Sequence, residues 1–495
     1  MNAFDKLTEH AKTLSHFNHL AAICGWDQAA MMPSGGNDAR SEAMATLSVH
    51  LHQLQNQPQL ADWFNDAENQ SLSAQQQASL REMKRQWQQA TVLPESLVKT
   101  QSLAGAKCEH AWRSQRSQND WIGFEKNWAE VVKLSQEEAQ IRAEVNGCSR
   151  YDAMLDLYEP GVTTAQLDAL FSDVKTWLPE MIDQAIDKQA KQPIIEASGQ
   201  FPATAQKALG QQVMQLLQFD FNHGRLDEST HPFCGGVPTD VRITTRYNEQ
   251  EFTQSLMGIV HETGHARYEQ GLPKLLAGLP AGEARSMGLH ESQSLFFEMQ
   301  LGRSRAFVSH LSHMAAQQFP QHDSKLFELD NLHRLYTKVE KGFIRVDADE
   351  LTYPAHVILR FEIERDLING QISHRDVPEL WHQKMQQYLG LSTAGNYQNG
   401  CMQDIHWTDG TFGYFPSYTL GAMYAAQFMA AMRQTVDVDN VVTSGDLTPI
   451  FSWLEEKIWR HGSTLTTDEL VRHASGEALN AKHFKRHLSE RYLVK

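Results

Sequence analysis

Residues 261–265 read His-Glu-Thr-Gly-His, a pattern that can hold and use a metal ion. On a helix, residues four positions apart lie on one face, so His261 and His265 can bind the same ion. Glu262 lies beside them, where its carboxylate can take a proton from a water that the ion activates. The pattern therefore predicts metal-assisted hydrolysis of a carbonyl compound, such as a peptide. The alternative is a surface helix that carries two incidental histidines.

The residues before this pattern predict a helix that is anchored in the core. Phe252, Leu256 and Ile259 follow helical spacing and point roughly opposite to the two histidines. Asn248 with Glu251 predicts an N-cap pair. Gly258 falls on the histidine side, where a missing side chain would let another element approach. Thr263 departs from the bulky apolar residue that is frequent at this position.

A catalytic zinc needs a third protein ligand. Glu291, which opens another helical stretch thirty positions after His261, is the candidate. His290 would support the ligands rather than bind the metal. Glu298 follows seven residues after Glu291 and is either a further supporting group or a solvated acid.

Helical periodicity dominates the chain, and the fold class it predicts is mainly α. Thr163 with Gln166 indicates a capping box for a helix to about residue 186, which Pro179 should break or kink. Residues 240–247 alternate β-branched and polar side chains and predict a strand, hence a small β-sheet next to the metal helix. No long linker or repeat divides the sequence. Residues 1–495 are therefore expected to form a single domain with a deep groove, which could separate two lobes.

Composition limits the partners. Lys+Arg 44 against Asp+Glu 60 gives a net charge of −16, which disfavours nucleic acid and anionic membrane surfaces. The five cysteines form no CxxC pair and are expected to be reduced thiols. The N-terminus has no signal-peptide pattern, and no apolar run approaches the length of a membrane span. We expect a soluble, cytoplasmic protein.

With these residues in place, the chain resembles the carboxypeptidase Taq family of metallocarboxypeptidases over nearly its whole length. The matching stretches are residues 26–27, 32–33 and 40; 151–152 and 158–161; 231–233 and 240–244; 261–265 and 290–293; 344–349; and 400–407. The resemblance implies a homodimeric, groove-bearing enzyme that removes C-terminal residues one at a time with broad tolerance. It supports Glu291 as third ligand. It also implies one divalent metal per chain, with zinc expected and cobalt or manganese as alternatives.

A carboxypeptidase must bind the free C-terminal carboxylate of its peptide substrate, which arginine does best. Arg345 is the first candidate because of its place in the matching stretch 344–349, although it could instead pair with Asp347 or Asp349. Arg242 is the second, and it could instead brace the strand.

The oxyanion of the reaction needs a donor besides the metal. His406, Tyr414 and Tyr418 are the candidates, by similarity of this region to other helical metallopeptidases. Either tyrosine could instead be an aromatic of the groove wall. The predicted strand could offer its edge to the backbone of an extended peptide.

Two other functions compete with a carboxypeptidase. A helical oligopeptidase, either a dipeptidase or an endopeptidase, could use the same metal core, and it would not require a free C-terminus. An inert helical binding protein would hold no metal and would be insensitive to a chelator.

Overall fold

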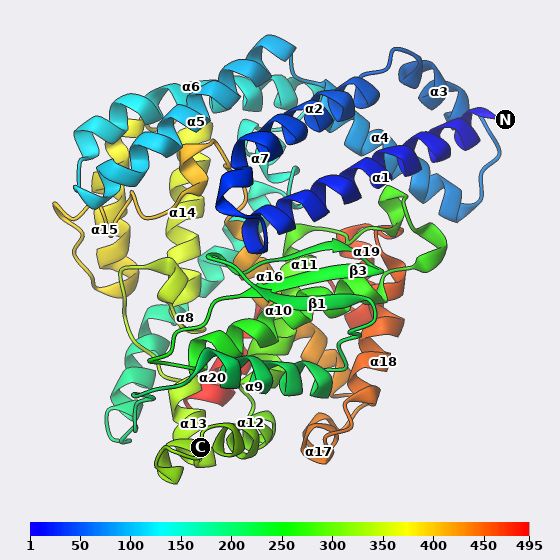
Figure 1. Cartoon of the computed structure of the whole chain (residues 1–495). Helices are drawn as coiled ribbons and strands as arrows, with labels where there is room; N and C mark the ends of the chain where they lie inside the picture. Colours follow the sequence, from blue (N-terminus) through cyan, green and yellow to red (C-terminus); the bar gives the residue numbers. More distant parts are fainter. Residues whose placement is uncertain (495) are drawn as a thin grey trace.

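The computed structural model describes residues 1–494, and helices dominate it, which confirms the predicted mainly-α fold. The first four helices form a layer of their own along one side of the molecule (Figure 1). The helices before the sheet are α1 (Ala3–Ala30), α2 (Asn37–Gln55), α3 (Gln59–Glu68), α4 (Ala74–Thr91), α5 (Glu95–Ser117), α6 (Trp121–Asn146), α7 (Arg150–Leu155), α8 (Thr164–Gln189) and α9 (Ala203–Leu216).

A three-stranded sheet consists of β1 (Gly224–Glu228), β2 (Cys234–Val237) and β3 (Asp240–Thr245). The strand order is β1-β3-β2; β1 runs parallel to β3, and β2 pairs antiparallel with it, with Cys234 opposite Ile243. β3 confirms the strand predicted from residues 240–247. Helix α1 contacts β2, and Figure 1 shows α1 crossing over the sheet. β2 is therefore an edge strand that lies between α1 and the centre of the molecule.

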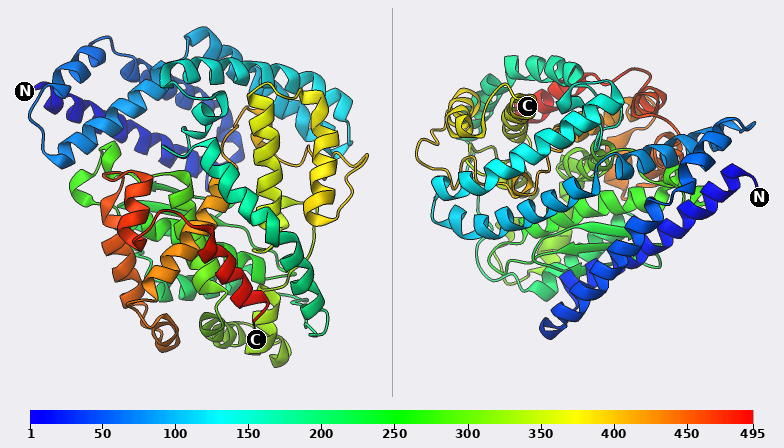
Figure 2. Two further views of the ribbon diagram at one scale, coloured as in Figure 1. Left: turned by 180° about the vertical axis from the view of Figure 1, so that it is seen from behind. Right: turned by 90° about the horizontal axis from the view of Figure 1, so that it is seen from above.

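The second half of the chain is again helical. Its helices are α10 (Thr253–Gly271), α11 (Met287–Leu295), α12 (Arg305–Gln318), α13 (Leu329–Tyr336), α14 (Tyr353–Ile368), α15 (Val377–Leu389), α16 (Pro416–Met432), α17 (Val438–Ser444), α18 (Thr448–Lys457), α19 (Thr467–Ser475) and α20 (Ala481–Tyr492). The π-helix η4 (Phe296–Gly302) continues α11 directly. Helix α11 contacts both α10 and α16. The views from behind and above show helices on the other sides of the molecule (Figure 2).

Helix α8 differs from the prediction at Pro179. The capping box of Thr163 and Gln166 is present, but the helix continues through Pro179 to Gln189, so of the predicted break or kink the break did not occur. Proline removes one backbone hydrogen bond. Buried side chains on both sides of it, including Trp177 and Met181, hold the helix against the core. Tertiary packing outweighs the local cost here.

The hydrophobic core has one large cluster and two small ones. The large cluster joins buried side chains from α5 to α20. One small cluster belongs to α1, α3, α4 and residues 276–281, and the other to the sheet, α9 and α10. The N-terminal layer thus packs around its own apolar centre. Among residues 1–494, no helix is long and apolar enough to cross a membrane.

Candidate metal centre and active site

Helix α10 carries the His-Glu-Thr-Gly-His pattern and begins later than predicted. Its first residue is Thr253, and no side chain of Asn248 caps it, so the predicted Asn248 cap is wrong. Asn248 instead accepts a hydrogen bond from the backbone N–H of Gln250, within the turn that precedes the helix. The Glu251 carboxylate accepts the N–H of Gln254 at 3.1 Å and so satisfies the first turn.

The apolar stripe of α10 is buried as predicted: Phe252, Leu256 and Ile259 are at most 2% exposed. The opposite face, with His261 and His265, borders cavities. One helix therefore has one face in the core and one face open to a ligand.

Two glycines that the sequence analysis did not single out bring the third ligand to α10. A Cβ at Gly264 would lie 2.5 Å from the Gln293 carbonyl oxygen, and a Cβ at Gly421 would lie 2.7 Å from Cγ of Glu291. Helices α11 and α16 can approach only because both side chains are missing. Gly258 does not have the predicted role, because a Cβ there would meet open space.

The three predicted ligands lie together. His261, His265 and Glu291 each offer one ligand atom, and these atoms all lie within 4.8 Å of one another. His265 Nε2 lies 3.5 Å from Glu291 Oε2. Two imidazoles and one carboxylate, all partly buried, form the donor set typical of a catalytic divalent metal such as zinc. The residues therefore fit such an ion.

His261 and His265 each have a partner at the ring nitrogen Nδ1. His261 Nδ1 lies 2.8 Å from Glu298 Oε2, and Glu298 also accepts a hydrogen bond from Arg303 at 2.6 Å. His265 Nδ1 lies 3.1 Å from the carbonyl oxygen of His290. Such contacts fix the ring orientation that leaves Nε2 for a metal. Glu298 is thus a supporting group of the site and not a solvated acid.

Glu262 lies in the wall of the same site. Its side chain lines the larger cavity and is 9% exposed. Burial raises the pKa of Glu262 to about 7. A carboxyl group with such a pKa can both accept and return a proton near neutral pH.

Two cavities meet at the candidate metal centre. The larger, of about 1180 Å³, is lined by β2, α1, Glu262 and His265. The smaller, of about 510 Å³, is lined by His261 and Arg345. Glu291 and Tyr418 line both cavities. The predicted metal ligands therefore lie where the two cavities adjoin.

Arg345 is held rigidly in the smaller cavity. Its Nε donates to Asp404 at 2.9 Å and its Nη1 to the Tyr353 hydroxyl at 2.6 Å, whereas neither Asp347 nor Asp349 pairs with it. Among residues 1–494, Nη2 has no hydrogen-bond partner. Burial would raise the pKa of Asp404, but Arg360 and Arg345 lower it to about 2. Arg345 can thus present one free N–H edge to a carboxylate.

Asp404 and Tyr353 were not predicted as site residues. Asp404 stands in the stretch 400–407 that carries the family resemblance, which is the one signal that could have indicated it. Tyr353 opens α14 and has no comparable signal.

Arg242 lies in a different environment from Arg345. Its guanidinium pairs with Asp240 at 3.0 and 2.9 Å and lies 4.2 Å from the centre of the Trp26 ring. It lines neither cavity. These contacts brace β3 against α1.

Of the three predicted oxyanion donors, the two tyrosines reach the cavities. Tyr414 and Tyr418 both line the larger cavity, with ring centres 5.3 Å apart. Burial raises the pKa of Tyr414 to about 12, so its hydroxyl stays protonated. His406 lines neither cavity; its ring centre lies 5.7 Å from that of Tyr414. Burial lowers the pKa of His406 to about 4, which keeps the imidazole neutral.

A helical fold with two histidines and a glutamate at a deep depression, a glutamate beside them and an arginine nearby defines a metal-dependent peptidase. The family model described as carboxypeptidase Taq (M32) metallopeptidase matches residues 6–492, and the chain belongs to this family. It is a metallocarboxypeptidase, as the sequence predicted, and the findings do not support the competing functions.

The relatives match over nearly their full lengths. Carboxypeptidase 1 of Bacillus subtilis (strain 168) is 34% identical over 97% of this chain and 96% of its own. Thermostable carboxypeptidase 1 of Thermus thermophilus is 34% identical over 99% of this chain and 98% of its own. The solved structure of Trypanosoma cruzi metallocarboxypeptidase 1 has a TM-score of 0.97 at 45% identity, covering 99% of each chain.

Proposed function

We propose that the divalent metal of this metallocarboxypeptidase is zinc, held by His261, His265 and Glu291. Two imidazoles and one carboxylate suit zinc, with cobalt or manganese as the alternatives, and both histidines have a partner at Nδ1. When bound, the ion makes a water acidic and polarises the scissile carbonyl.

The chain's own residues supply the proton transfers and the orientation. Glu262 takes the proton of the attacking water and returns it to the leaving amine. Tyr418, which lines both cavities, donates a hydrogen bond from its hydroxyl to the oxyanion, and Tyr414 beside it is the second candidate. His406 supports Tyr414 through ring contact.

The observation that carries the proposed direction of binding is the free edge of Arg345 in the smaller cavity. We place the C-terminal residue of the peptide there, with its carboxylate on Arg345. The remainder of the peptide extends into the larger cavity along the edge strand β2. About 510 Å³ admits any side chain, which supports broad specificity. Arg242, the second candidate from the sequence, lines neither cavity and braces β3, so we do not place the carboxylate on it.

A digest of a mixed peptide library, followed by mass spectrometry with and without chelator, tests this function. We expect ladders that lose one residue at a time from the C-terminus, and no ladders with chelator. Internal cuts or N-terminal losses would contradict it.

The metal ligands give a direct prediction. Purified protein should hold about one divalent ion per chain and lose activity when a chelator removes it. Glu291→Ala should strongly reduce metal content, measured by elemental analysis, because it removes one of three protein ligands. Glu340→Ala, which changes an exposed glutamate, is the matched control. Full occupancy in Glu291→Ala would exclude Glu291 as a ligand.

We also propose that residues 1–495 act as one domain and that the protein is a cytoplasmic homodimer. All five cysteines are free, which fits a reducing compartment. The net charge of −16 disfavours nucleic acid and membranes as partners. The dimer would use the outer face of α1 and α2, because α2 has no buried residue and Leu20, Met31 and Val49 are at least half exposed.

The dimer surface has its own test. Val49→Asp should lower the mass measured by light scattering from two chains to one, because it places a charge in an apolar interface. Val98→Asp, at an exposed position of α5, is the control. A dimer that survives Val49→Asp would place the interface elsewhere.

A further inference from the structure

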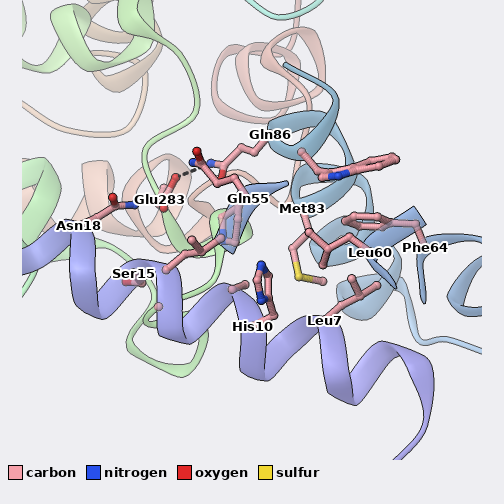
Figure 3. A pocket seen from close by; sticks show the side chains of 15 residues that line it. Leu7, His10, Ser15, Asn18, Gln55, Leu60, Phe64, Met83, Gln86 and Glu283 are labelled. Carbon is pink, nitrogen blue, oxygen red and sulfur yellow. Dashed lines mark hydrogen bonds between the residues drawn. The ribbon is translucent and has the colours of Figure 1, made fainter. Parts of the chain in front are cut away.

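A third pocket, smaller than both cavities of the candidate active site, lies within the N-terminal helical layer. It has a volume of about 70 Å³ and lies between α1, α3, α4 and residues 278–283. Its apolar walls belong to the small hydrophobic cluster of this layer (Figure 3). The side chains that make these walls are Leu7, Ala11, Leu60, Phe64, Met83 and Trp87. Such a pocket fits one apolar side chain.

The pocket adjoins the larger active-site cavity. Ser15, Asn18, Gly278 and Glu283 line both. Helix α1 connects them, because one of its faces lines the small pocket from Leu7 to Asn18 and the larger cavity from Lys12 to Ala22. A peptide that lies in the larger cavity can therefore continue into the pocket without leaving the protein surface.

Polar groups at the pocket can bind a peptide backbone. Glu283, an exposed side chain at the rim of the pocket, accepts a hydrogen bond from Gln86 through Oε2 at 2.8 Å (Figure 3). His10 Nε2 is buried and lacks a partner in the described part of the chain. Figure 3 shows the His10 ring rising from α1 toward the pocket. An apolar site with a few polar groups is typical of ligand recognition.

We infer that this pocket binds an apolar side chain of the peptide substrate, on the N-terminal side of the bond that is cut. The inference rests on the proposed direction of binding. With such a pocket, kcat/KM would depend on a residue far from the C-terminus of the peptide as well as on the C-terminal residue itself.

The length of α1 gives an approximate distance between the pocket and the larger cavity. Ala22, which lines the larger cavity, is eleven residues after Ala11, or about 16 Å along α1. An extended peptide covers this distance in about five residues. The reach from Ala22 to the pocket thus corresponds to about five peptide residues, and we expect the preferred apolar residue at a distal position several residues before the scissile bond.

The experiment uses octapeptides with one fixed C-terminal sequence and a single leucine moved through otherwise polar positions. The readout is kcat/KM for release of the C-terminal residue. Burial of one leucine should raise kcat/KM about tenfold to a hundredfold at one distal position. No preference at any distal position would overturn the inference.

Variants that fill the pocket provide the second part of the experiment. Ala11→Leu should abolish the distal preference and leave release from a tripeptide unchanged, because a tripeptide does not reach the pocket. Leu14→Trp is a second filling variant should Ala11→Leu not fold, and Ala165→Leu, on exposed α8 surface, is the control. A preference that persists in a filled variant would overturn the inference. Failure of the wild type to release the C-terminal residue from any of the octapeptides would contradict the proposed function itself.

Discussion

Arg345→Ala should reduce kcat/KM for a peptide with a free C-terminus by roughly thirty- to several-thousandfold. The loss of a charge-assisted pair in a dry site costs about 2–5 kcal/mol, which gives this range. Asp404 and Tyr353 hold the guanidinium in place, so little ordering is needed when the carboxylate binds. The measurement is the initial rate of release of the C-terminal amino acid.

Cleavage of the C-terminal amide of the same peptide distinguishes lost recognition of the carboxylate from damage to the fold. The wild type should cleave the amide poorly, since amidation removes the charge that Arg345 binds. Arg345→Ala should lose little further activity on the amide, whereas a distorted site would lose activity on both substrates. N-terminal acetylation should matter little.

Arg242→Ala is the matched control for Arg345→Ala. Arg242 braces β3 against Trp26 and lines neither cavity. Its loss should therefore lower the stability of the fold and leave the ratio of acid to amide cleavage nearly unchanged. If the wild type cut acid and amide equally well, the proposed direction of binding would fail. If only Arg345→Ala had no effect, a tyrosine of the smaller cavity would have to bind the carboxylate.

Glu262→Gln should reduce kcat by at least about a hundredfold while the metal is retained. The amide keeps the shape of the carboxylate but cannot accept the proton of the attacking water. Metal content should not change, because the three proposed ligands are untouched. Turnover and elemental analysis on the same preparation measure both quantities.

Glu269→Gln is the matched control for the base. Glu269 lies on the same helix and lines the same cavity, but it contacts His290 at 2.7 Å. Replacing Glu269 should reduce kcat less than replacing Glu262, because Glu269 contacts His290, a supporting histidine. Near-normal turnover of Glu262→Gln would remove Glu262 from the mechanism.

The sequence by itself determined the features that depend on local spacing. The four-residue step between His261 and His265 and the stripe of Phe252, Leu256 and Ile259 opposite them fixed a helix with one buried and one functional face. Alternation identified the strand at residues 240–245. These predictions succeeded because helix and strand geometry repeat along the chain.

Local rules were less reliable where packing competes with them. Pro179 did not break α8, because the buried side chains around it hold the helix. Asn248 did not cap α10, because it belongs to the preceding turn and Glu251 satisfies the first N–H groups instead. Both cases involve single hydrogen bonds, which tertiary contacts easily outweigh.

Only the tertiary structure decided how the site is assembled. Gly264 and Gly421 permit the approach of three helices around Glu291, and Asp404 holds Arg345 from 59 positions away. The junction of two cavities at the metal ligands, and the small pocket beside α1, likewise arise where distant segments meet. Sequence periodicity describes neighbours within one element, whereas these contacts depend on how separate elements pack, and that is set by the shapes of all the side chains between them.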